Sequence, residues 1–331
     1  MKKIFALITA ILLCGYSFAQ NNNGVITQTG DNQNGNISQT GNLNASTITQ
    51  STDNMGAQTS DVIQDGKKNE AYVQQNQTGG GSNSPQNTAY IEQIGDNNYG
   101  SQYENTPGYN SGDVQHAEQH GNGNNVIQNM AFGYGLYQNS FQQGNNNIAQ
   151  QYSSTSQGYQ SSSIHTEGNN NQAYQTASGT KANLHITQTG GNNNYANQNF
   201  SGPFGFVPSN TGDITQTGSS NTGYQTLTGM ANNNMDLTQT GSSNNSVQNQ
   251  TGDNNSSTTT QNGNSNMAYS YQYDGVDGNS ATIGQTGNSN YGYIIQTGDQ
   301  NTASITSNGN SHSGTISQTG GMNQAVITQN N

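Results

Sequence analysis

The chain has 331 residues, of which 27% are hydrophobic and 7% are charged, and its formal net charge is −12. Typical globular domains are about 45–50% apolar and about 25% charged, so this composition argues against a conventional α/β enzyme or a helix bundle and excludes a polytopic membrane protein. Low hydrophobicity is also typical of disordered chains. The richness in Asn, Gln, Gly, Ser and Thr therefore leaves two interpretations: disorder, or a fold held by hydrogen-bonded side-chain ladders.

Residues 1–19 are predicted to be a secretory signal peptide. Lys2–Lys3 form a basic start, Ile4–Leu13 is almost wholly apolar, and Ser17–Ala19 offers small residues to a signal peptidase. The apolar run is too short for a bilayer core of about 30 Å. We therefore expect a secreted chain that begins at Gln20, with residues 20–331 as a single repeat domain.

The predicted mature chain has few groups for charged partners or metals. Its only cysteine, Cys14, would leave with the signal peptide, and the residues before it do not fit a lipoprotein anchor. Only Lys67, Lys68 and Lys181 oppose 17 acidic residues. Nucleic acids and anionic membranes are bound by clustered basic residues, so we expect neither as a partner and no insertion into a membrane.

Residues 25–75 contain the first regular repeats. Gln28, Gln39 and Gln50 are 11 residues apart, and after an insertion Gln64 and Gln75 resume this spacing. The shared unit is Q-x-G-x-x-N-x-[AGS]-x-[IV]-x-Q. A fixed period over many units is typical of a repeat architecture, so it favours order over disorder.

Residues 76–209 keep the pattern more loosely. Single units survive, for example around Gln93 and Gln119. We predict loops at Gly79–Pro85, Tyr103–Gly112 and Asn197–Pro208, the last because its two prolines would interrupt a strand ladder. We expect the same solenoid with insertions here, and no second domain.

Residues 210–331 return to the regular spacing. The series begins with glutamines 11 residues apart and, after one interval of 13, continues at the same spacing: Gln239, Gln250, Gln261 and Gln272, then Gln285, Gln296, Ser307, Gln318 and Gln329. In the copy that follows Ser307, His312 stands where the unit has Asn.

The alternation within each unit predicts its fold. Asn, the small residue, the aliphatic residue and Gln recur at every second position, which is the period of a strand, so all four are expected on one side. The piece after each Gln is expected to turn, because its Gly tolerates positive φ. Two units of 11 residues then make one strand–turn–strand rung of about 22 residues. We expect 13 or 14 stacked rungs, an all-β solenoid about 60 Å long that forms a cross-β fibre on assembly.

Two sets of residues are expected to build this arrangement. The inward side chains of the clearest units are the predicted amyloid-core ladder: Gln28, Gln39, Asn44, Ile48, Gln50, Gln64, Asn69, Gln75, Gln239, Asn244, Gln250, Asn255, Gln261, Asn266, Gln272, Gln285, Asn290, Ile294, Gln296, Asn301, Ile305, Gln318, Asn323, Ile327 and Gln329. The predicted turn glycines are Gly30, Gly41, Gly66, Gly218, Gly241, Gly252, Gly263, Gly287, Gly298, Gly309 and Gly320.

The unit resembles the curlin repeat of bacterial curli fibre subunits, Q-x-G-x-x-N-x-A-x-x-x-Q, from about Val25 to Gln329. The resemblance implies a secreted structural subunit, and not an enzyme, that self-polymerises into extracellular amyloid fibres for biofilm matrix or adhesion. From the residues themselves we predict no cofactor and no metal site. The partners that the resemblance implies are further copies, a nucleator subunit and outer-membrane secretion machinery of the curli type. The last unit lacks the basic residues of the curli nucleator, so the chain resembles the major subunit.

A monomeric secreted solenoid is the alternative interpretation. Such a protein could act as an adhesin. It could also bind ice, because Thr27 and Thr29 flank Gln28 and similar pairs recur along the chain. Outward threonines are also favourable strand residues without any such role. Capped ends and a soluble monomer would favour these functions over a fibre.

One pair of histidines has a spacing that could serve a metal site. His116 and His120 flank Glu118, but the order H-A-E-Q-H is not the H-E-x-x-H of zinc proteases. On a strand both side chains would point to one side, where weak binding of Zn²⁺ or Cu²⁺ is conceivable. Scattered surface histidines are the simpler interpretation, and no catalytic residue is predicted.

Overall fold

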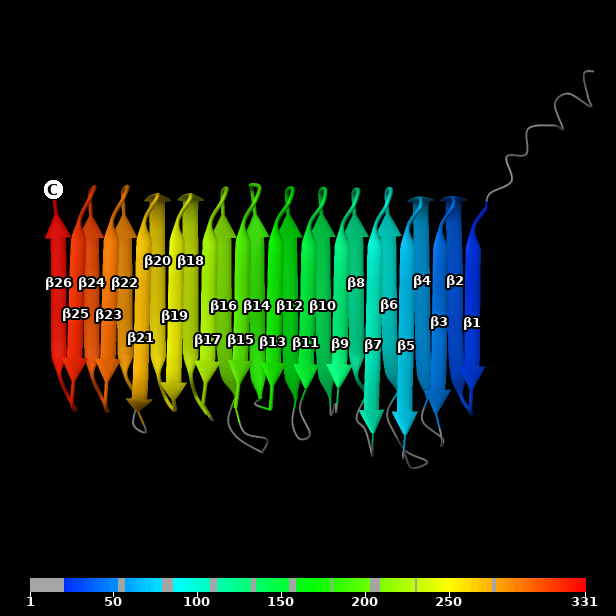
Figure 1. Ribbon diagram of the computed structural model, residues 1–331, viewed down its shortest axis with the longest axis horizontal. Helices are drawn as coiled ribbons and strands as arrows, with labels where there is room; N and C mark the ends of the chain where they lie inside the picture. The colour runs from blue at the N-terminus through cyan, green and yellow to red at the C-terminus, as the bar shows by residue number, and fades with distance from the viewer. Residues whose placement is uncertain are drawn as a thin grey trace, which may run out of the picture.

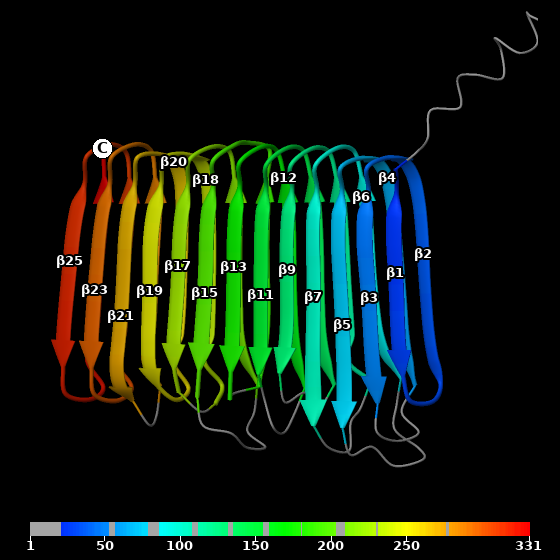
Figure 2. The ribbon, with the colours of Figure 1, turned by 45° about the vertical axis from the view of Figure 1, so that its right-hand side comes forward.

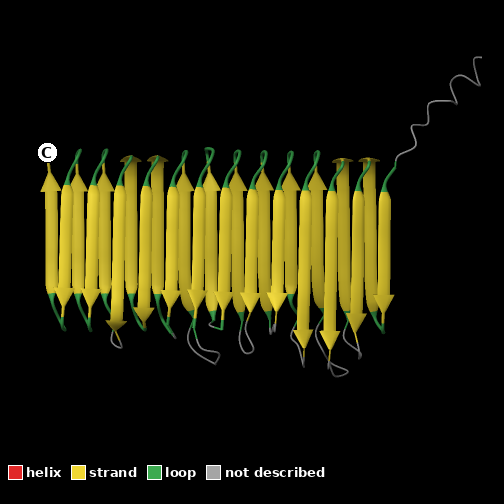
Figure 3. Ribbon diagram, in the orientation of Figure 1, coloured by secondary structure: helices red, strands yellow, loops and turns green. Residues whose placement is uncertain are grey.

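The structure is a computed structural model that describes residues 21–52, 57–78, 86–107, 112–131, 135–154, 159–179, 181–202, 209–229, 231–275 and 278–331. Within these residues the only regular secondary structure is the β-strand (Figure 3). The predicted all-β solenoid is confirmed. Because the described part of the chain contains no helix, it contains none that could cross a membrane.

The strands form two parallel sheets of thirteen strands each, stacked side by side along the long axis (Figure 1). The odd-numbered sheet contains β1 (Asn23–Thr29), β3 (Ala45–Thr52), β5 (Glu70–Thr78), β7 (Tyr99–Pro107), β9 (Asn125–Ala131), β11 (Ile148–Ser154), β13 (Gln172–Ser178), β15 (Tyr195–Ser201), β17 (Thr222–Thr228), β19 (Asn245–Gly252), β21 (Met267–Gly275), β23 (Tyr291–Thr297) and β25 (Ser313–Thr319).

The even-numbered sheet lies behind it (Figure 2). It contains β2 (Gln33–Asn42), β4 (Gln58–Lys67), β6 (Asn87–Ile94), β8 (Val114–His120), β10 (Leu136–Gln143), β12 (Gln160–Glu167), β14 (Ala182–Thr189), β16 (Asn210–Thr217), β18 (Asn234–Ser242), β20 (Ser256–Asn264), β22 (Ser280–Thr286), β24 (Thr302–Asn308) and β26 (Gln324–Asn330).

Each strand pairs with the strand two places further along the chain, so one odd and one even strand make one rung. In the regular rungs the offset is 22 residues, as for the paired Gln28 and Gln50. It rises to 29 residues between Gln75 and Glu104. The mean is about 24 residues per rung, more than the predicted 22, because insertions lengthen some connections while the strands stay in register.

The two edges of the solenoid differ in how they absorb insertions. Every connection from an even to an odd strand keeps the spacing Gly-x-x-Asn, from Gly41–Asn44 onward, with His312 replacing Asn in the last copy. These short turns form the uniform upper edge in Figure 1. Connections from odd to even strands vary in length. For example, β5 ends at Thr78 and β6 begins only at Asn87. Variation in length is therefore confined to one edge.

Two predicted loops are partly strand. Tyr103–Pro107 belongs to β7, and Asn197–Ser201 belongs to β15. Burial alternates along both segments up to Thr106 and Ser201, so the ladder continues and the connection starts only after the strand. Both segments therefore extend the ladder past the point where each loop was expected to begin. The third predicted loop, Gly79–Pro85, lies outside the described residues.

The apolar core is a narrow strip between the two sheets. Its largest cluster contains Ile48 and Ile91, and a second contains Ile294 and its neighbours near the C-terminus. A third cluster, in the middle of the molecule, is built around Phe200. Most other buried side chains are Gln, Asn, Ser or Thr, so the interior is held largely by polar groups that must find hydrogen-bond partners.

Candidate functional site

Inward and outward residues alternate along the strands. In β3, Ser46, Ile48 and Gln50 are buried between the sheets, whereas Thr47 and Thr49 lie on the outer surface. Successive side chains of a strand point to opposite faces, and parallel pairing in register stacks equivalent residues of successive rungs. The inward side chains thus form three columns in each sheet. We name them the small-residue, aliphatic and glutamine columns, after Ser46, Ile48 and Gln50.

The glutamine column of the even-numbered sheet runs through most of the solenoid. Gln39 Nε2 donates to Gln64 Oε1 at 2.8 Å, and Gln64 Nε2 donates to Gln93 Oε1 at 2.8 Å. Equivalent bonds of 2.8–3.2 Å join Gln93 to Gln119, Gln119 to Gln142, Gln188 to Gln216, Gln216 to Gln239, Gln239 to Gln261 and Gln261 to Gln285. Thr166 and Ser307 interrupt the column, although Ser307 Oγ donates to Gln329 Oε1 at 3.0 Å.

In the odd-numbered sheet the glutamine column is present in the rungs near the two ends. The N-terminal bonds run from Gln28 to Gln50 at 2.8 Å and from Gln50 to Gln75 at 3.0 Å. The C-terminal bonds of 2.8–3.0 Å join Gln250 to Gln272, Gln272 to Gln296 and Gln296 to Gln318. In both regular regions, successive predicted glutamines therefore alternate between the two sheets, and those in the same sheet stack in one column.

The middle of the odd-numbered sheet exchanges two columns. Apolar side chains such as Met130, Phe200 and Leu227 occupy the glutamine column there. A separate glutamine ladder occupies the aliphatic column, with bonds of 2.7–3.0 Å from Gln102 through Gln128, Gln151, Gln175, Gln198 and Gln225 to Gln248. The 11-residue spacing does not predict this ladder. Its signal is a glutamine two residues after the small residue instead of four, as in Ala149 and Gln151.

A second hydrogen bond fixes the direction of the amides. Gln239 Nε2 also donates to the backbone carbonyl of Thr222 in the opposite sheet at 2.9 Å, and equivalent bonds occur along the ladders. A carbonyl oxygen can only accept, so the amide nitrogen must face it, and Oε1 is left for the preceding glutamine. All the glutamine ladders therefore donate toward the C-terminal end.

This direction explains where buried acceptors lack a donor. Gln102, Gln188 and Gln250 are each the first glutamine of a ladder segment, and their buried Oε1 atoms accept no hydrogen bond from the described protein atoms. An unsatisfied buried acceptor costs about 1–3 kcal/mol. The interruptions before these three glutamines therefore each have a cost, whereas the one at Ser307 does not, because its hydroxyl donates to the next glutamine, Gln329.

Asparagine ladders line the turns. The backbone N–H of Asn69 donates to Asn44 Oδ1 at 3.1 Å, and Asn44 Nδ2 donates to the carbonyl oxygen of Gly66 at 3.0 Å. At the C-terminal end the backbone N–H of His312 donates to Asn290 Oδ1 at 3.0 Å, so His312 preserves the backbone bond. A second asparagine ladder, on the opposite edge, joins Asn210, Asn233, Asn255, Asn279, Asn301 and Asn323.

The predicted turn glycines all have positive φ, from 99° at Gly41 to 135° at Gly66. A Cβ on Gly41 would lie 1.9 Å from the carbonyl oxygen of Gly66, so the close stacking of rungs also excludes a side chain. One correction concerns their place. The glycines that form the ends of strands, where pairing continues past the expected turn, are Gly41, Gly66, Gly241, Gly252 and Gly263.

Comparison with known families agrees with this geometry. Residues 277–309 match the model of a family described as the curlin associated repeat. They span β22, β23 and β24, three regular strands. These residues therefore carry a curlin associated repeat, and the match supports a curlin-repeat assignment for the chain. A comparison with curated proteins found no match. The curlin-repeat family is structural and not enzymatic, and the repeat together with the solenoid is compatible with a curli-like structural subunit.

The two end rungs are open within the part of the solenoid that the structure describes. Ile26 is 43% exposed, Gln28 is exposed and Gln39 is half-buried, whereas the equivalent glutamines of interior rungs are buried. At the other end Ile327 and Gln329 are half-buried. The predicted ladder residues that are not fully buried all belong to these two ends: Gln28, Gln39, Asn323, Ile327 and Gln329. Each end therefore presents the inner columns to solvent.

A buried pair of carboxyl groups lies at the junction between the regular N-terminal rungs and the middle. Asn87 lies between Glu104 and Asp113: its Nδ2 donates to Glu104 Oε1, and its Oδ1 accepts from the backbone N–H of Asp113 at 3.1 Å. Gln75 Nε2 donates to Glu104 Oε2 at 3.3 Å, so Glu104 ends the N-terminal glutamine column.

The surroundings of this pair favour the protonated form. Burial raises the pKa of Asp113 to about 7, although the backbone N–H of Leu136 donates to its carboxylate and opposes the rise. Burial, followed by the charge of Asp113, raises the pKa of Glu104 well above its ordinary value. Exposed carboxyl groups are already ionised in this pH range. The pair is therefore sensitive to pH near neutrality.

His116 and His120 lie on the outer surface of β8. His116 Nε2 is 3.2 Å from Glu118 Oε1, and His120 Nε2 is 3.7 Å from Glu92 Oε1. Tyr90 stacks on His116 with ring centroids 4.8 Å apart. Within the part of the chain that the structure describes, no group of three or more His, Cys, Asp or Glu could hold a metal ion.

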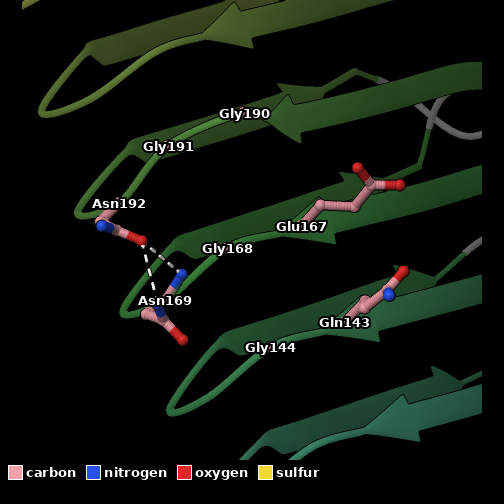
Figure 4. A pocket seen from close by; sticks show the side chains of 8 residues that line it. All are labelled: Gln143, Gly144, Glu167, Gly168, Asn169, Gly190, Gly191 and Asn192. Carbon is pink, nitrogen blue, oxygen red and sulfur yellow. Dashed lines mark hydrogen bonds between the residues drawn. The ribbon is translucent and has the colours of Figure 1, made fainter.

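A shallow hollow of about 470 Å³ lies over three successive Gly-x-x-Asn turns of the solenoid (Figure 4). It exists because glycines such as Gly144 and Gly168 leave no side chain there. At its rim the backbone N–H and Nδ2 of Asn169 donate to Asn192 Oδ1 at 2.8 and 3.2 Å. The one carboxyl group in the lining is Glu167, so the hollow offers no acid–base pair.

Proposed function

We propose that the chain is a secreted structural subunit that polymerises end to end into extracellular curli-like amyloid fibres. The match between the two ends of the solenoid carries this proposal. β1 and β2 form one end and β25 and β26 the other, and each has one side without a strand partner among the described residues. The unpaired backbone groups of an edge strand are a template for another chain.

The inner columns continue across a junction between two such ends. If β1 of an added copy pairs with β25, the small, aliphatic and glutamine columns of the odd-numbered sheet stay in register: Gly24, Ile26 and Gln28 of the copy meet Gly314, Ile316 and Gln318. Pairing of β2 with β26 does the same in the even-numbered sheet, where Gly35, Ile37 and Gln39 meet Ala325, Ile327 and Gln329. Like side chains therefore stack on like.

The glutamine ladders give this addition a direction. At the C-terminal end, Gln318 and Gln329 each donate one Nε2 hydrogen to a backbone carbonyl and keep the second for a further rung. At the N-terminal end, the Oε1 atoms of Gln28 and Gln39 have no donor among the described residues. Donors therefore meet acceptors only when the C-terminal end of one copy joins the N-terminal end of the next.

The family supports an extracellular fibre, and the predicted signal peptide would send the chain into secretion. Growth would then use further copies of the chain, a nucleator subunit and outer-membrane secretion machinery of the curli type. The fibres would serve biofilm matrix or adhesion. A fibre of this kind needs neither a cofactor nor a catalytic residue, because its activity is templated folding.

The end glutamines offer the first test. In the double variant Gln318→Ala and Gln329→Ala, the junction loses two hydrogen bonds of about 1 kcal/mol each, so we expect a roughly 30-fold higher critical concentration and slower elongation from seeds. Thr315→Ala with Thr328→Ala is the matched control, because these residues lie on the outer side of the same two strands. Equal elongation of both variants would contradict docking through the C-terminal rung.

Fibre diffraction tests the assembly itself. The mature chain, diluted from denaturant and aligned, should give reflections near 4.7–4.8 Å along the fibre and about 10 Å across it. A clear solution of compact monomers would instead show that the ends are capped. That result would favour the soluble alternatives, an adhesin or an ice-binding solenoid.

A further inference from the structure

The two outer faces of the solenoid differ in charge. Among the described outward positions of the odd strands, Glu70 is the one charged side chain. The outward positions of the even strands carry many carboxyl groups, including Asp61, Glu92, Glu118 and Asp213. We call the outer side of the odd-numbered sheet the tyrosine face and that of the even-numbered sheet the acidic face.

The tyrosine face holds most of the chain's 18 tyrosines, in rows along the solenoid. The ring centroids of Tyr174 and Tyr195 are 5.6 Å apart, and those of Tyr195 and Tyr224 are 5.2 Å apart, across three successive rungs. A further row includes Tyr271 and Tyr293 at 5.7 Å. Parallel in-register pairing therefore aligns the rings in rows, with shallow hollows of about 130 and 200 Å³ beside Tyr72 and Tyr152.

This face is open to solvent. Tyr224 is 37% exposed and Met267 is 47% exposed, although both lie in interior rungs. Figure 2 shows the odd strands side by side with no other described element across them. Large exposed apolar surfaces on soluble proteins mark interaction sites, and tyrosine is enriched in such interfaces.

The size of the tyrosine face fits a stable interface. Thirteen strands spaced about 4.8 Å apart, each about 23 Å long, give a face of roughly 1,300 Å². A standard protein–protein interface buries about 800 Å² on each partner. One solenoid therefore offers enough surface, on this face alone, for a stable lateral contact.

The lack of charge on the tyrosine face indicates which partner can pack against it. A face with almost no charge can pack against a second copy of itself without repulsion, and a two-fold axis makes such a contact self-complementary. The acidic face would bring like charges together in the same arrangement, which costs free energy. We propose that two solenoids pack laterally, tyrosine face against tyrosine face, so that the fibre is built from paired solenoids. This proposal rests on the proposed fibre function.

The phenol groups keep the face neutral over a wide pH range. Burial, followed by the charge of neighbouring tyrosines, raises the pKa of Tyr174, Tyr224 and Tyr271 above the ordinary value of 10.0. The rings therefore stay uncharged in any neutral or mildly alkaline medium. A contact between neutral faces should also be insensitive to salt, unlike one made by ion pairs.

Charge placed on one face or the other tests the proposal. The tyrosine-face variant carries Tyr174→Lys, Tyr224→Lys and Tyr271→Lys, and the matched control carries Thr215→Lys, Thr258→Lys and Thr282→Lys on the acidic face. Mass per unit length of the fibres is measured by dark-field scanning transmission electron microscopy. We expect wild-type and control fibres to have twice the value of one solenoid, and the tyrosine-face variant to have half of that.

Other outcomes separate this proposal from the fibre itself. Wild-type fibres with the mass of one solenoid would overturn the pairing, and if they adsorbed to an insoluble polysaccharide the face would be reassigned to that partner. An equal effect of both variants, or none of either, would also overturn it. If no fibres form at all, end-to-end growth fails, but lateral pairing still requires a dimer in sedimentation equilibrium, and a monomer would refute it. Should the triple variant lose its β-sheet circular dichroism, Tyr224→Lys alone repeats the comparison.

Discussion

The C-terminal rungs and the middle rungs of the odd-numbered sheet fill the same interior in opposite ways. From β21 to β25 the glutamine column holds Gln272, Gln296 and Gln318, and Ile294 and Ile316 lie two residues before the last two of these. From β9 to β17 glutamines occupy the aliphatic column, and apolar side chains such as Phe200 occupy the glutamine column. Both arrangements keep an unbroken ladder.

The comparison teaches that the fold requires glutamines to stack on glutamines in successive rungs, but does not require them at one fixed position of the repeat motif. A glutamine is satisfied when the next rung has a glutamine at the same height, whichever of the two columns it occupies. The cost appears where the columns change. Gln102 and Gln250 stand at these changes, and each has a buried acceptor without a donor. The glutamine ladder can therefore move from one column to the other, but each such change leaves one buried acceptor unpaired and lowers the stability.

The largest expected effect concerns the apolar side chains that occupy the glutamine column in the middle rungs. Phe200→Ala should lower the free energy of unfolding by about 3–5 kcal/mol, because it leaves a cavity in the cluster that contains Leu227 and Met235. Urea denaturation of the unassembled solenoid measures it. Asn199→Ala, on the outer side of the same strand, is the control and should change little. A small loss in Phe200→Ala would mean that the middle does not depend on this cluster.

The junction between the N-terminal rungs and the middle should depend on pH. The pKa of Asp113 rises from 3.8 in the unfolded chain to about 7 in the folded one, so its stabilising proton is fully present below about pH 4 and is lost as pH rises through about 7. Urea unfolding should show roughly 3 kcal/mol less stability at pH 8 than at pH 4. Asp113→Asn with Glu104→Gln should remove most of this dependence, and an unchanged pH profile in that variant would contradict it.

One glutamine from each region tests whether the two ladders are equivalent. Gln272→Met and Gln175→Met keep the volume but leave a donor, an acceptor and a backbone carbonyl unpaired in each case. Both should cost about 2–3 kcal/mol in urea unfolding, because the orphaned buried groups are the same. A much smaller loss for Gln175→Met would show that the middle ladder is secondary to the apolar column beside it.

Filling the gap in the glutamine ladder of the even-numbered sheet should give the smallest change in stability, and that change should be an increase. Thr166 interrupts a ladder between Gln142 and Gln188, whose Oε1 has no donor among the described protein atoms. Thr166→Gln would supply both missing bonds and should raise the stability by about 1–2 kcal/mol in thermal or urea unfolding. Ser163→Gln, which points outward from the same strand, is the control. Destabilisation by Thr166→Gln would show that the gap is needed for packing.

The sequence predicted the fold because the strand period and the Gly-x-x-Asn turn are both local patterns. Gln261 and Gly263, for example, could be placed by spacing alone. The middle ladder from Gln102 to Gln248 could not, because a two-residue shift of glutamine within the unit looks like irregularity until the strands are paired. The buried positions of Glu104 and Asp113 were also hidden, since nothing local shows that an acidic residue near an insertion points inward.

The common direction of the glutamine amides gives the solenoid an electrical polarity. In a parallel sheet, the N–H and C=O groups of successive residues point along the stacking axis in opposite senses, so their dipoles largely cancel. The side-chain amides of the ladders from Gln39 to Gln142 and from Gln102 to Gln248 do not cancel, because each donates the same way. They add to a permanent dipole with its positive pole at the C-terminal end. A long rod of this kind would orient in an electric field even where its net charge is uniform.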